Sequence, residues 1–151
     1  MVASLRRSMW SALRNPAWIC FIWFGMTAGV SLLATPIRFT AATITRPVAL
    51  DVGRVVFSAL NKAELVALVL LLIVVRSSGR ARAMWATCGV LALILIAQSA
   101  WLLPELATRT QMIISGREPP QSYVHAIYST LELAKLGILF VSGFVALSEQ
   151  K

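Results

Sequence analysis

Long apolar stretches, separated by short polar segments, dominate the pattern along the chain. A hydrocarbon core about 30 Å thick needs about 20 helical residues to cross it, and each stretch reaches or nearly reaches that length. The stretches also lack the continuous polar face of an ordinary surface helix. The sequence therefore predicts an all-α fold, a four-transmembrane-helix bundle forming a single domain over residues 1–151. The predicted spans cover residues 17–34, 55–75, 83–103 and 124–147.

Prolines indicate where the helices begin and end. Pro16 suits the first turn of the first span, whereas Pro36 is expected to end that helix. Pro104 lies just beyond the expected end of the third span. The segment Thr45-Arg46-Pro47 is typical of a helix start, so the second helix is expected to begin outside the bilayer.

The first span could alternatively be a secretory signal, because several arginines precede it. A cleavage site ending at Ala34 would place Leu32 where signal peptidase requires a small residue. We therefore expect an uncleaved anchor. Gly25 and Gly29 form a small-xxx-small pair within it, which would allow another helix to approach closely.

The chain is strongly basic, with 14 Lys and Arg against 6 Asp and Glu and a formal net charge of +8. Such a charge is also found in nucleic-acid-binding proteins, but there it gathers on one face. Here the arginines lie between apolar runs, a placement that lipid headgroups and the positive-inside rule favour. With 58% hydrophobic residues, the chain is expected to contact a lipid bilayer and not nucleic acid.

The distribution of basic residues predicts an orientation. An even number of spans places both termini on the same side as the short loop from Arg76 to Arg82. That side holds seven Lys and Arg, and the opposite side holds five. Because cytoplasmic loops carry an excess of these residues, both termini are expected to be cytoplasmic.

Two polar stripes descend from the exterior side into the second and fourth spans. Successive helical residues are about 100° apart, which places these side chains within narrow arcs of each helix. The first stripe comprises Asp51, Arg54, Ser58, Asn61 and Lys62, with Glu64 about 60° to one side. The second comprises His125, Tyr128, Ser129, Glu132 and Lys135.

Charged residues in these stripes need partners inside a membrane. Each ionised side chain at a helix centre costs about 2.5–3.5 kcal/mol, so four unpaired charges would cost on the order of 10 kcal/mol. Matching depth from the exterior and balancing charge, we predict that Lys62 pairs with Glu132 and that Glu64 pairs with Lys135.

Two interpretations of the stripes remain open. In the first, they line an exterior-facing polar cavity that binds a small ligand or conducts an ion. In the second, they form a structural ion-pair lock in an accessory or assembly subunit of a larger membrane complex, with other subunits or further copies as partners. The candidate residues for either role are Asn61, Lys62, Glu64, His125, Tyr128, Glu132 and Lys135.

The sequence contains no motif that indicates an enzyme. His125 is the only histidine, which excludes bis-histidine haem ligation within one chain and a His-rich metal site. Cys20 and Cys88 form no Cys-x-x-Cys motif and are interpreted as reduced, apolar cysteines. No Gly-x-Ser-x-Gly, phosphate-binding glycine loop or zincin helix is present. We expect no catalytic activity, no cofactor and no metal.

The segment after the first span carries two short motifs, Pro36-Ile-Arg-Phe39 and Gly53-Arg-Val-Val-Phe57. With the segment His125-Ala-Ile-Tyr128, followed by Glu132 and Lys135, it resembles uncharacterised bacterial four-span inner-membrane proteins. The resemblance extends more distantly to eukaryotic TMEM-type proteins with Pro-x-x-Phe and Gly-Arg-x-x-Phe patterns. It implies a four-helix fold in a bacterial inner membrane and no assigned reaction. The loop signature comprises Pro36, Arg38, Phe39, Asp51, Gly53 and Arg54.

Physical chemistry suggests roles for these loop residues. Gly53 permits close packing, and Arg54 can pair with Asp51 one turn earlier. A solvated pair of that kind contributes only a few tenths of a kcal/mol. The alternative is that Arg38 or Arg54 binds an anionic lipid headgroup.

Overall fold

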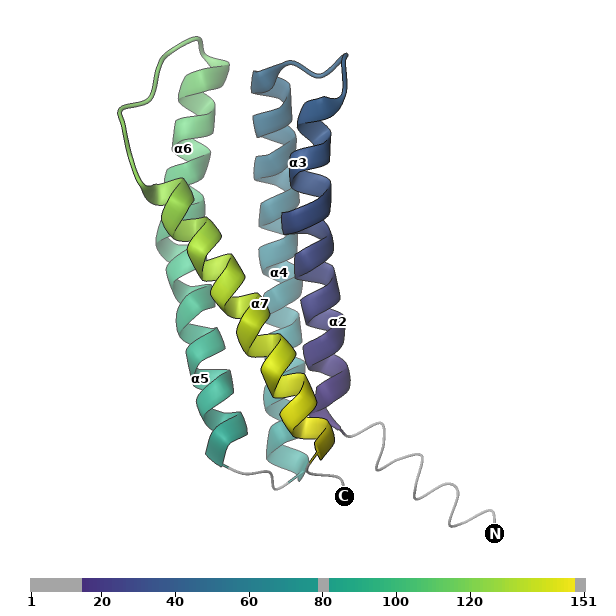
Figure 1. Cartoon of the computed structure of the whole chain (residues 1–151). Coiled ribbons are helices and arrows are strands. Elements are labelled where there is room, and N and C mark those ends of the chain that lie inside the picture. The colour runs from purple at the N-terminus through teal and green to yellow at the C-terminus, as the bar shows by residue number, and fades with distance from the viewer. Residues whose placement is uncertain (1–14, 79–81, 149–151) are drawn as a thin grey trace.

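The computed structural model describes residues 15–78 and 82–148, and four helical runs within them pack side by side (Figure 1). Each run is long and apolar enough to cross a membrane. The predicted all-α four-helix class is confirmed, and helix length and hydropathy make the chain a multi-pass membrane protein. Five basic residues used for the predicted orientation lie outside the described residues: Arg6, Arg7, Arg14, Arg80 and Lys151.

Two of the four runs change helix type along their length. The second and fourth runs are uninterrupted α-helices, α4 (Arg46–Ser78) and α7 (Val124–Ser148). The first consists of α2 (Pro16–Ala28), the π-helical turn η1 (Gly29–Ala34), α3 (Thr35–Ile37) and the 3-10 turn η2 (Arg38–Thr40). The third consists of α5 (Arg82–Ala97), the π-helical turn η3 (Gln98–Leu102) and α6 (Leu103–Ile114).

Pro36 and Pro104 do not end their helices, contrary to the prediction. Pro36 lies within α3 and Pro104 within α6, each directly after a π turn. In a regular α-helix, proline removes one hydrogen bond and its ring clashes with the carbonyl four residues earlier. A π turn changes the hydrogen-bond spacing to i→i+5 at that point, which accommodates the ring. The first run therefore continues to Thr40 and the third to Ile114.

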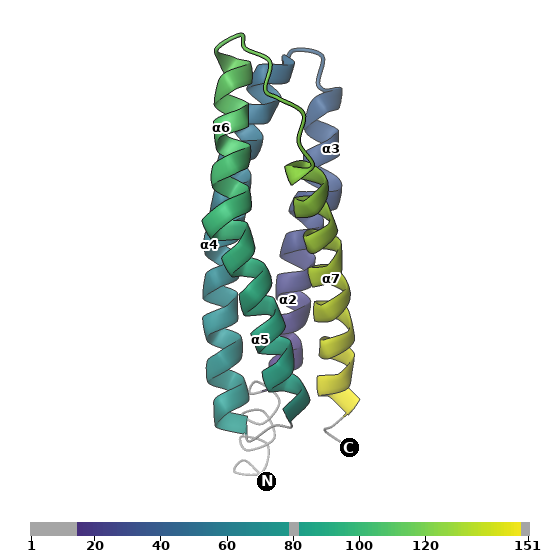
Figure 2. The ribbon, with the colours of Figure 1, turned by 90° about the vertical axis from the view of Figure 1, so that its left-hand side faces the viewer.

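The helices form a closed ring in which α4 and α7 lie diagonally opposite each other. The helix α2 packs against both α7 and α4, and α5 packs against both from the other side (Figure 2). The beginning of α2 and the end of α7 meet at one end of the bundle. There the side-chain amide of Asn15 donates to the carbonyl of Ala146 at 3.1 Å and accepts from the backbone N–H of Ala17.

The half of the bundle near this end has a closely packed apolar core. Packing by dispersion contacts holds membrane helices together, because lipid supplies no hydrophobic driving force between them. Both cysteines are free thiols buried in this core. Its buried members are Ala17, Cys20, Trp23, Leu68, Leu71, Val75, Met84, Cys88, Leu91, Leu95, Leu139 and Ala146.

Gly143 allows a close contact between α7 and α2. A Cβ atom at this position would lie 2.7 Å from the ring of Phe21, which packs edge-on against Phe144 at 5.3 Å between centroids. No neighbour lies within 4 Å of a Cβ built at Gly25 or Gly29. The close helix approach predicted at that glycine pair is therefore not made within the described chain.

The substitution Gly143→Val is expected to destabilise the bundle by about 1–3 kcal/mol, because overpacking forces neighbouring groups to move. Thermal unfolding in detergent, followed by circular dichroism, would measure this loss as a lower melting temperature. Gly25→Val is the matched control and should leave the melting temperature nearly unchanged, since its added side chain meets no other helix. Equal melting temperatures for the two variants would contradict the α2–α7 contact.

Candidate functional site

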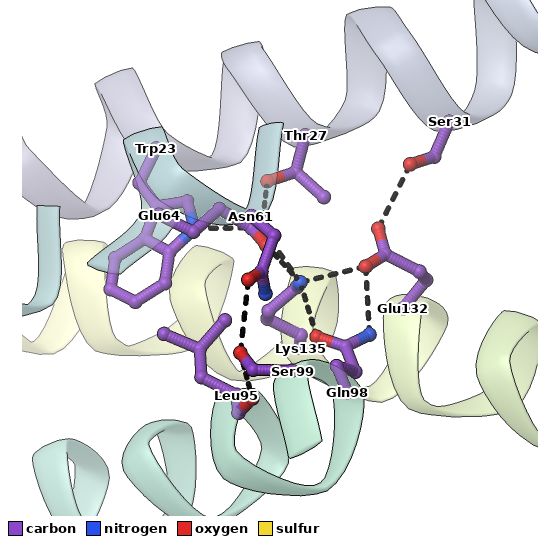
Figure 3. Close-up of polar contacts among 10 residues, drawn as sticks. All are labelled: Trp23, Thr27, Ser31, Asn61, Glu64, Leu95, Gln98, Ser99, Glu132 and Lys135. Atoms are coloured by element: carbon purple, nitrogen blue, oxygen red, sulfur yellow. Dashed lines mark hydrogen bonds and ion pairs between the residues drawn. The ribbon is translucent and has the colours of Figure 1, made fainter. Parts of the chain in front are cut away.

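A buried ion-pair network lies at the centre of the bundle, between α4 and α7 (Figure 3). The Nζ atom of Lys135 lies 2.6 Å from Oε1 of Glu64 and 2.7 Å from Oε1 of Glu132. Lys135 and Glu64 are 0% exposed and Glu132 is 3% exposed. The contact confirms the predicted pair of Glu64 with Lys135.

The predicted pair of Lys62 with Glu132 is wrong. Lys62 is exposed, and Glu132 pairs instead with Lys135, three residues further along its own helix. At about 100° per residue, Lys62 and Glu64 project about 200° apart. A helix that buries Glu64 therefore turns Lys62 outward, and the stripe predicted on this helix divides into buried Asn61 and exposed Lys62.

Neutral donors from α2 complete the surroundings of Glu64. The indole Nε1 of Trp23 and the hydroxyl of Thr27 both donate to Oε1 of Glu64, at 3.0 and 2.8 Å. Lys135 donates to Oε2 of the same carboxylate at 2.8 Å. Multiple donors and a nearby cation offset the cost of taking this carboxylate out of water.

Glu132 is held in a similar way by the two π turns. Ser31 of η1 donates to its Oε2 at 2.8 Å, and Gln98 of η3 donates to its Oε1 at 2.9 Å. Gln98 also accepts a hydrogen bond from Lys135 at 3.0 Å through its side-chain oxygen. The network thus draws on all four helical runs, with two carboxylates around a single ammonium group (Figure 3).

The candidate residues omitted these neutral partners, although the sequence contains a signal for them. Trp23, Thr27 and Ser31 recur every fourth residue in the first span and so share one helix face. Gln98 is an amide within an otherwise apolar segment. Counting charged residues alone directs attention to the second and fourth spans and overlooks these neutral donors.

A cavity of about 970 Å³ occupies the half of the bundle away from the beginning of α2 and the end of α7, with the network at its floor. Its wall combines polar groups with apolar side chains from η1, α4, α6 and α7. Glu132 belongs to both the network and the cavity wall, whereas Glu64 and Lys135 lie behind it. The predicted residues that line the cavity are Pro36, Arg38, Gly53, Arg54, Asn61, Lys62, His125, Tyr128 and Glu132.

The course of α7 makes room for this cavity. The helix begins well short of the far ends of α4 and α6 and crosses the bundle diagonally (Figure 1). Its first turns pack Val124 and Tyr128 into a small cluster with Leu102. Phe57 contacts the ring of Tyr128 edge-on, with centroids 5.5 Å apart. The beginning of α7 thus packs against η3 and α4. The cavity lies on its other side, next to η1 and α3.

The side-chain amide of Asn61 is only partly satisfied at the cavity wall. Its oxygen accepts a hydrogen bond from Ser99 at 2.9 Å, and Asn61 is 7% exposed. Its Nδ2 atom is buried and has no hydrogen-bond partner among the described residues. Most buried polar side-chain atoms in proteins are hydrogen-bonded, so a buried N–H without a partner needs an explanation.

Arg38 is the second cavity residue with an unsatisfied donor. Its Nε is buried without a partner among residues 15–78 and 82–148. The guanidinium carbon lies 5.0 Å from the ring centroid of Phe39 and 5.9 Å from that of Phe57. A Cβ at Gly53 would overlap the guanidinium group, so the glycine leaves room for the Arg38 side chain against α4.

Asp51 and Phe39 lie outside the cavity wall. Asp51 pairs with Arg54 at 2.7 Å, and both side chains are nearly half exposed, as expected for the predicted solvated pair. The ring of Phe39 is exposed. Within the described part of the chain, no group of three His, Cys, Asp or Glu side chains is arranged to hold a metal ion.

Comparisons of the chain with protein-family models, curated proteins and solved structures found no match. The resemblance to bacterial four-span proteins therefore extends only to the four long apolar helices, and no family is identified.

Proposed function

We propose that the protein binds a small ligand in the cavity between η1, α4, α6 and α7. The unpartnered Nδ2 of Asn61 carries this proposal, because it is buried at the cavity wall. A buried donor without a hydrogen bond costs about 1–3 kcal/mol. An acceptor atom on a bound ligand would satisfy the donor and remove that cost.

Binding is favoured over ion conduction by what lies beneath the cavity. The ion-pair network forms the floor of the cavity. Below the network lies the apolar core, in the half of the bundle near the beginning of α2 and the end of α7. An ion crossing that core would lose its hydration without gaining polar ligands. The network itself is proposed to be a structural ion-pair lock. Lys135 on α7 pairs with Glu64 on α4 and so holds the two helices together below the cavity.

The proposed orientation places both termini in the cytoplasm and the cavity in the exterior half of a bacterial inner membrane. Arg76 and Arg82 support it, because the end of α4, which holds Arg76, and the beginning of α5 at Arg82 lie at the same end of the bundle as the beginning of α2 and the end of α7 (Figure 1). The cavity then faces the periplasmic leaflet.

Native mass spectrometry of the protein extracted in polymer nanodiscs tests the proposal. The wild type is expected to retain a small molecule, and Asn61→Leu should retain clearly less of it, because losing one buried hydrogen bond weakens binding by up to about tenfold. Gln111→Leu is a matched control, since it removes an exposed amide of α6 that does not line the cavity. It should leave occupancy unchanged.

A second outcome would favour the accessory-subunit interpretation. If wild-type protein carries no small molecule and instead co-purifies with another membrane protein in fixed stoichiometry, ligand binding is wrong. Equal retention by wild type and Asn61→Leu would likewise count against a ligand in this cavity.

A further inference from the structure

Arg38 indicates the chemical class of the ligand. We propose that the cavity binds an amphiphile with an anionic oxygen group, a carboxylate or a phosphate, held by the Arg38 guanidinium. This inference rests on the proposed function above. Its evidence is independent of Asn61, because it comes from the charge, partners and position of a different side chain.

Arg38 is a cation without an acidic partner in the described part of the chain. Its contacts with the rings of Phe39 and Phe57 supply no hydrogen-bond acceptor, and its Nε is buried. The rigid donor fork of arginine matches carboxylate and phosphate groups, and such charge-assisted hydrogen bonds are strong. An anionic group entering the cavity would satisfy both the charge and the buried N–H.

The charges around the cavity also favour an anion. Arg54 and Lys62 line it in addition to Arg38, whereas Glu132, the acidic residue of the wall, is already bound by Lys135. Arg54 is partly neutralised by Asp51. Clefts with an excess of one charge concentrate ligands of the opposite sign.

The spacing of the two unsatisfied donors requires an elongated ligand. The guanidinium of Arg38 lies against Gly53, and Asn61 follows eight residues later on α4. At 1.5 Å per residue, this separates the two sites by about 12 Å along the helix. Apolar side chains, including Leu103 and Leu106, line the cavity along this distance. An amphiphile with its anionic head at Arg38, an apolar body and a second acceptor atom near Asn61 fits that arrangement.

Part of the cavity wall is apolar and exposed at the surface of the bundle. Leu32 on η1 and Leu133 on α7 both line it and are 55% and 58% exposed. On helices that cross a bilayer, side chains exposed at this depth contact acyl chains. The cavity wall at η1 and α7 therefore borders the acyl chains, which favours a ligand that reaches the cavity from the membrane.

Binding to delipidated protein in a neutral detergent, measured by native mass spectrometry, tests the inference. The probes are oleate against oleyl alcohol, and dioleoyl phosphatidylglycerol against dioleoyl phosphatidylcholine. The wild type should bind the anionic member of at least one pair about tenfold more tightly, the effect of one charge-assisted hydrogen bond. Arg38→Gln should bring this ratio near one while binding of the neutral member persists.

Two further variants separate charge from folding. Arg46 is an exposed arginine at the beginning of α4, near the same end of the bundle as Arg38, and it does not line the cavity. Arg46→Gln should therefore keep the tenfold preference for the anionic probe. Arg38→Lys keeps the charge without the donor fork and should show an intermediate preference. If the wild type prefers only phosphatidylglycerol over its neutral partner, the anionic ligand is a membrane phospholipid. If it prefers only oleate, the ligand is a free carboxylic acid.

Equal affinity of the wild type for anionic and neutral probes in both pairs would overturn the anionic class. So would an unchanged preference in Arg38→Gln. Either result would leave the proposed function standing, because that proposal depends on the loss of ligand in Asn61→Leu.

Discussion

Replacing Lys135 with methionine is expected to lower the free energy of unfolding by about 3–5 kcal/mol. The substitution removes the ammonium group that lies within 2.7 Å of both carboxylates and leaves Glu64 and Glu132 buried without a cation. Uncompensated buried charge is among the costliest defects in a folded chain. Unfolding in detergent, followed by tryptophan fluorescence, would measure the loss.

Two comparisons show whether the loss comes from charge. Lys62→Met removes an exposed lysine and should change stability by less than about 0.5 kcal/mol. The triple variant Glu64→Gln, Glu132→Gln, Lys135→Met should recover most of the stability, because replacing a whole buried ion pair with neutral groups is often tolerated. A Lys135→Met variant as stable as the wild type would rule out the ion pair.

Glu64→Leu is expected to destabilise the protein by at least about 2 kcal/mol. It leaves the donors of Trp23 and Thr27 without their acceptor, and each unsatisfied buried donor costs about 1–3 kcal/mol. Glu132 still neutralises Lys135, which limits the loss. The same fluorescence-detected unfolding experiment would measure it.

The control for this prediction is Glu118→Leu, which removes an exposed carboxylate in the loop before α7 and should have little effect. Glu64→Gln retains one acceptor oxygen and should be less damaging than Glu64→Leu. If Glu64→Leu and Glu118→Leu unfold alike, the hydrogen bonds assigned to Trp23 and Thr27 are absent.

The number and class of the helices could be predicted from the sequence because both depend on local composition. Long apolar stretches identify spans whatever the helices pack against. The pair of Glu64 with Lys135 was also predictable, since depth and charge balance restrict the choice.

Rotation of the helices was the part that could not be predicted from charge alone. Depth matching treated Lys62 and Glu64 as equivalent, although two residues on a helix point to nearly opposite sides. Placing Glu64 against Trp23 and Thr27 turns Lys62 outward, and this choice depends on tertiary contacts from α2. Lys135 then serves both carboxylates, which pairwise matching does not consider.

A polar cavity was predicted as one interpretation of the stripes, but its size and shape were not. Its volume results from the late start and diagonal course of α7, which depend on packing between segments distant in the sequence (Figure 1). The continuation of helices through Pro36 and Pro104 was also missed. Proline signals a break by default, and the compensating π turns leave no simple mark in composition.

The two π turns have a consequence for how the chain tolerates changes in length. Each inserts one residue into an otherwise α-helical run, and one residue corresponds to about 100° of rotation. Everything beyond η1, including Arg38, takes its angular setting from that extra residue. Deleting one residue of η1 would convert the π turn to a regular α-helical turn. The Arg38 guanidinium would then point away from Gly53, although no remaining side chain had been changed. Helix phase, as much as residue identity, is thus encoded in these two short segments.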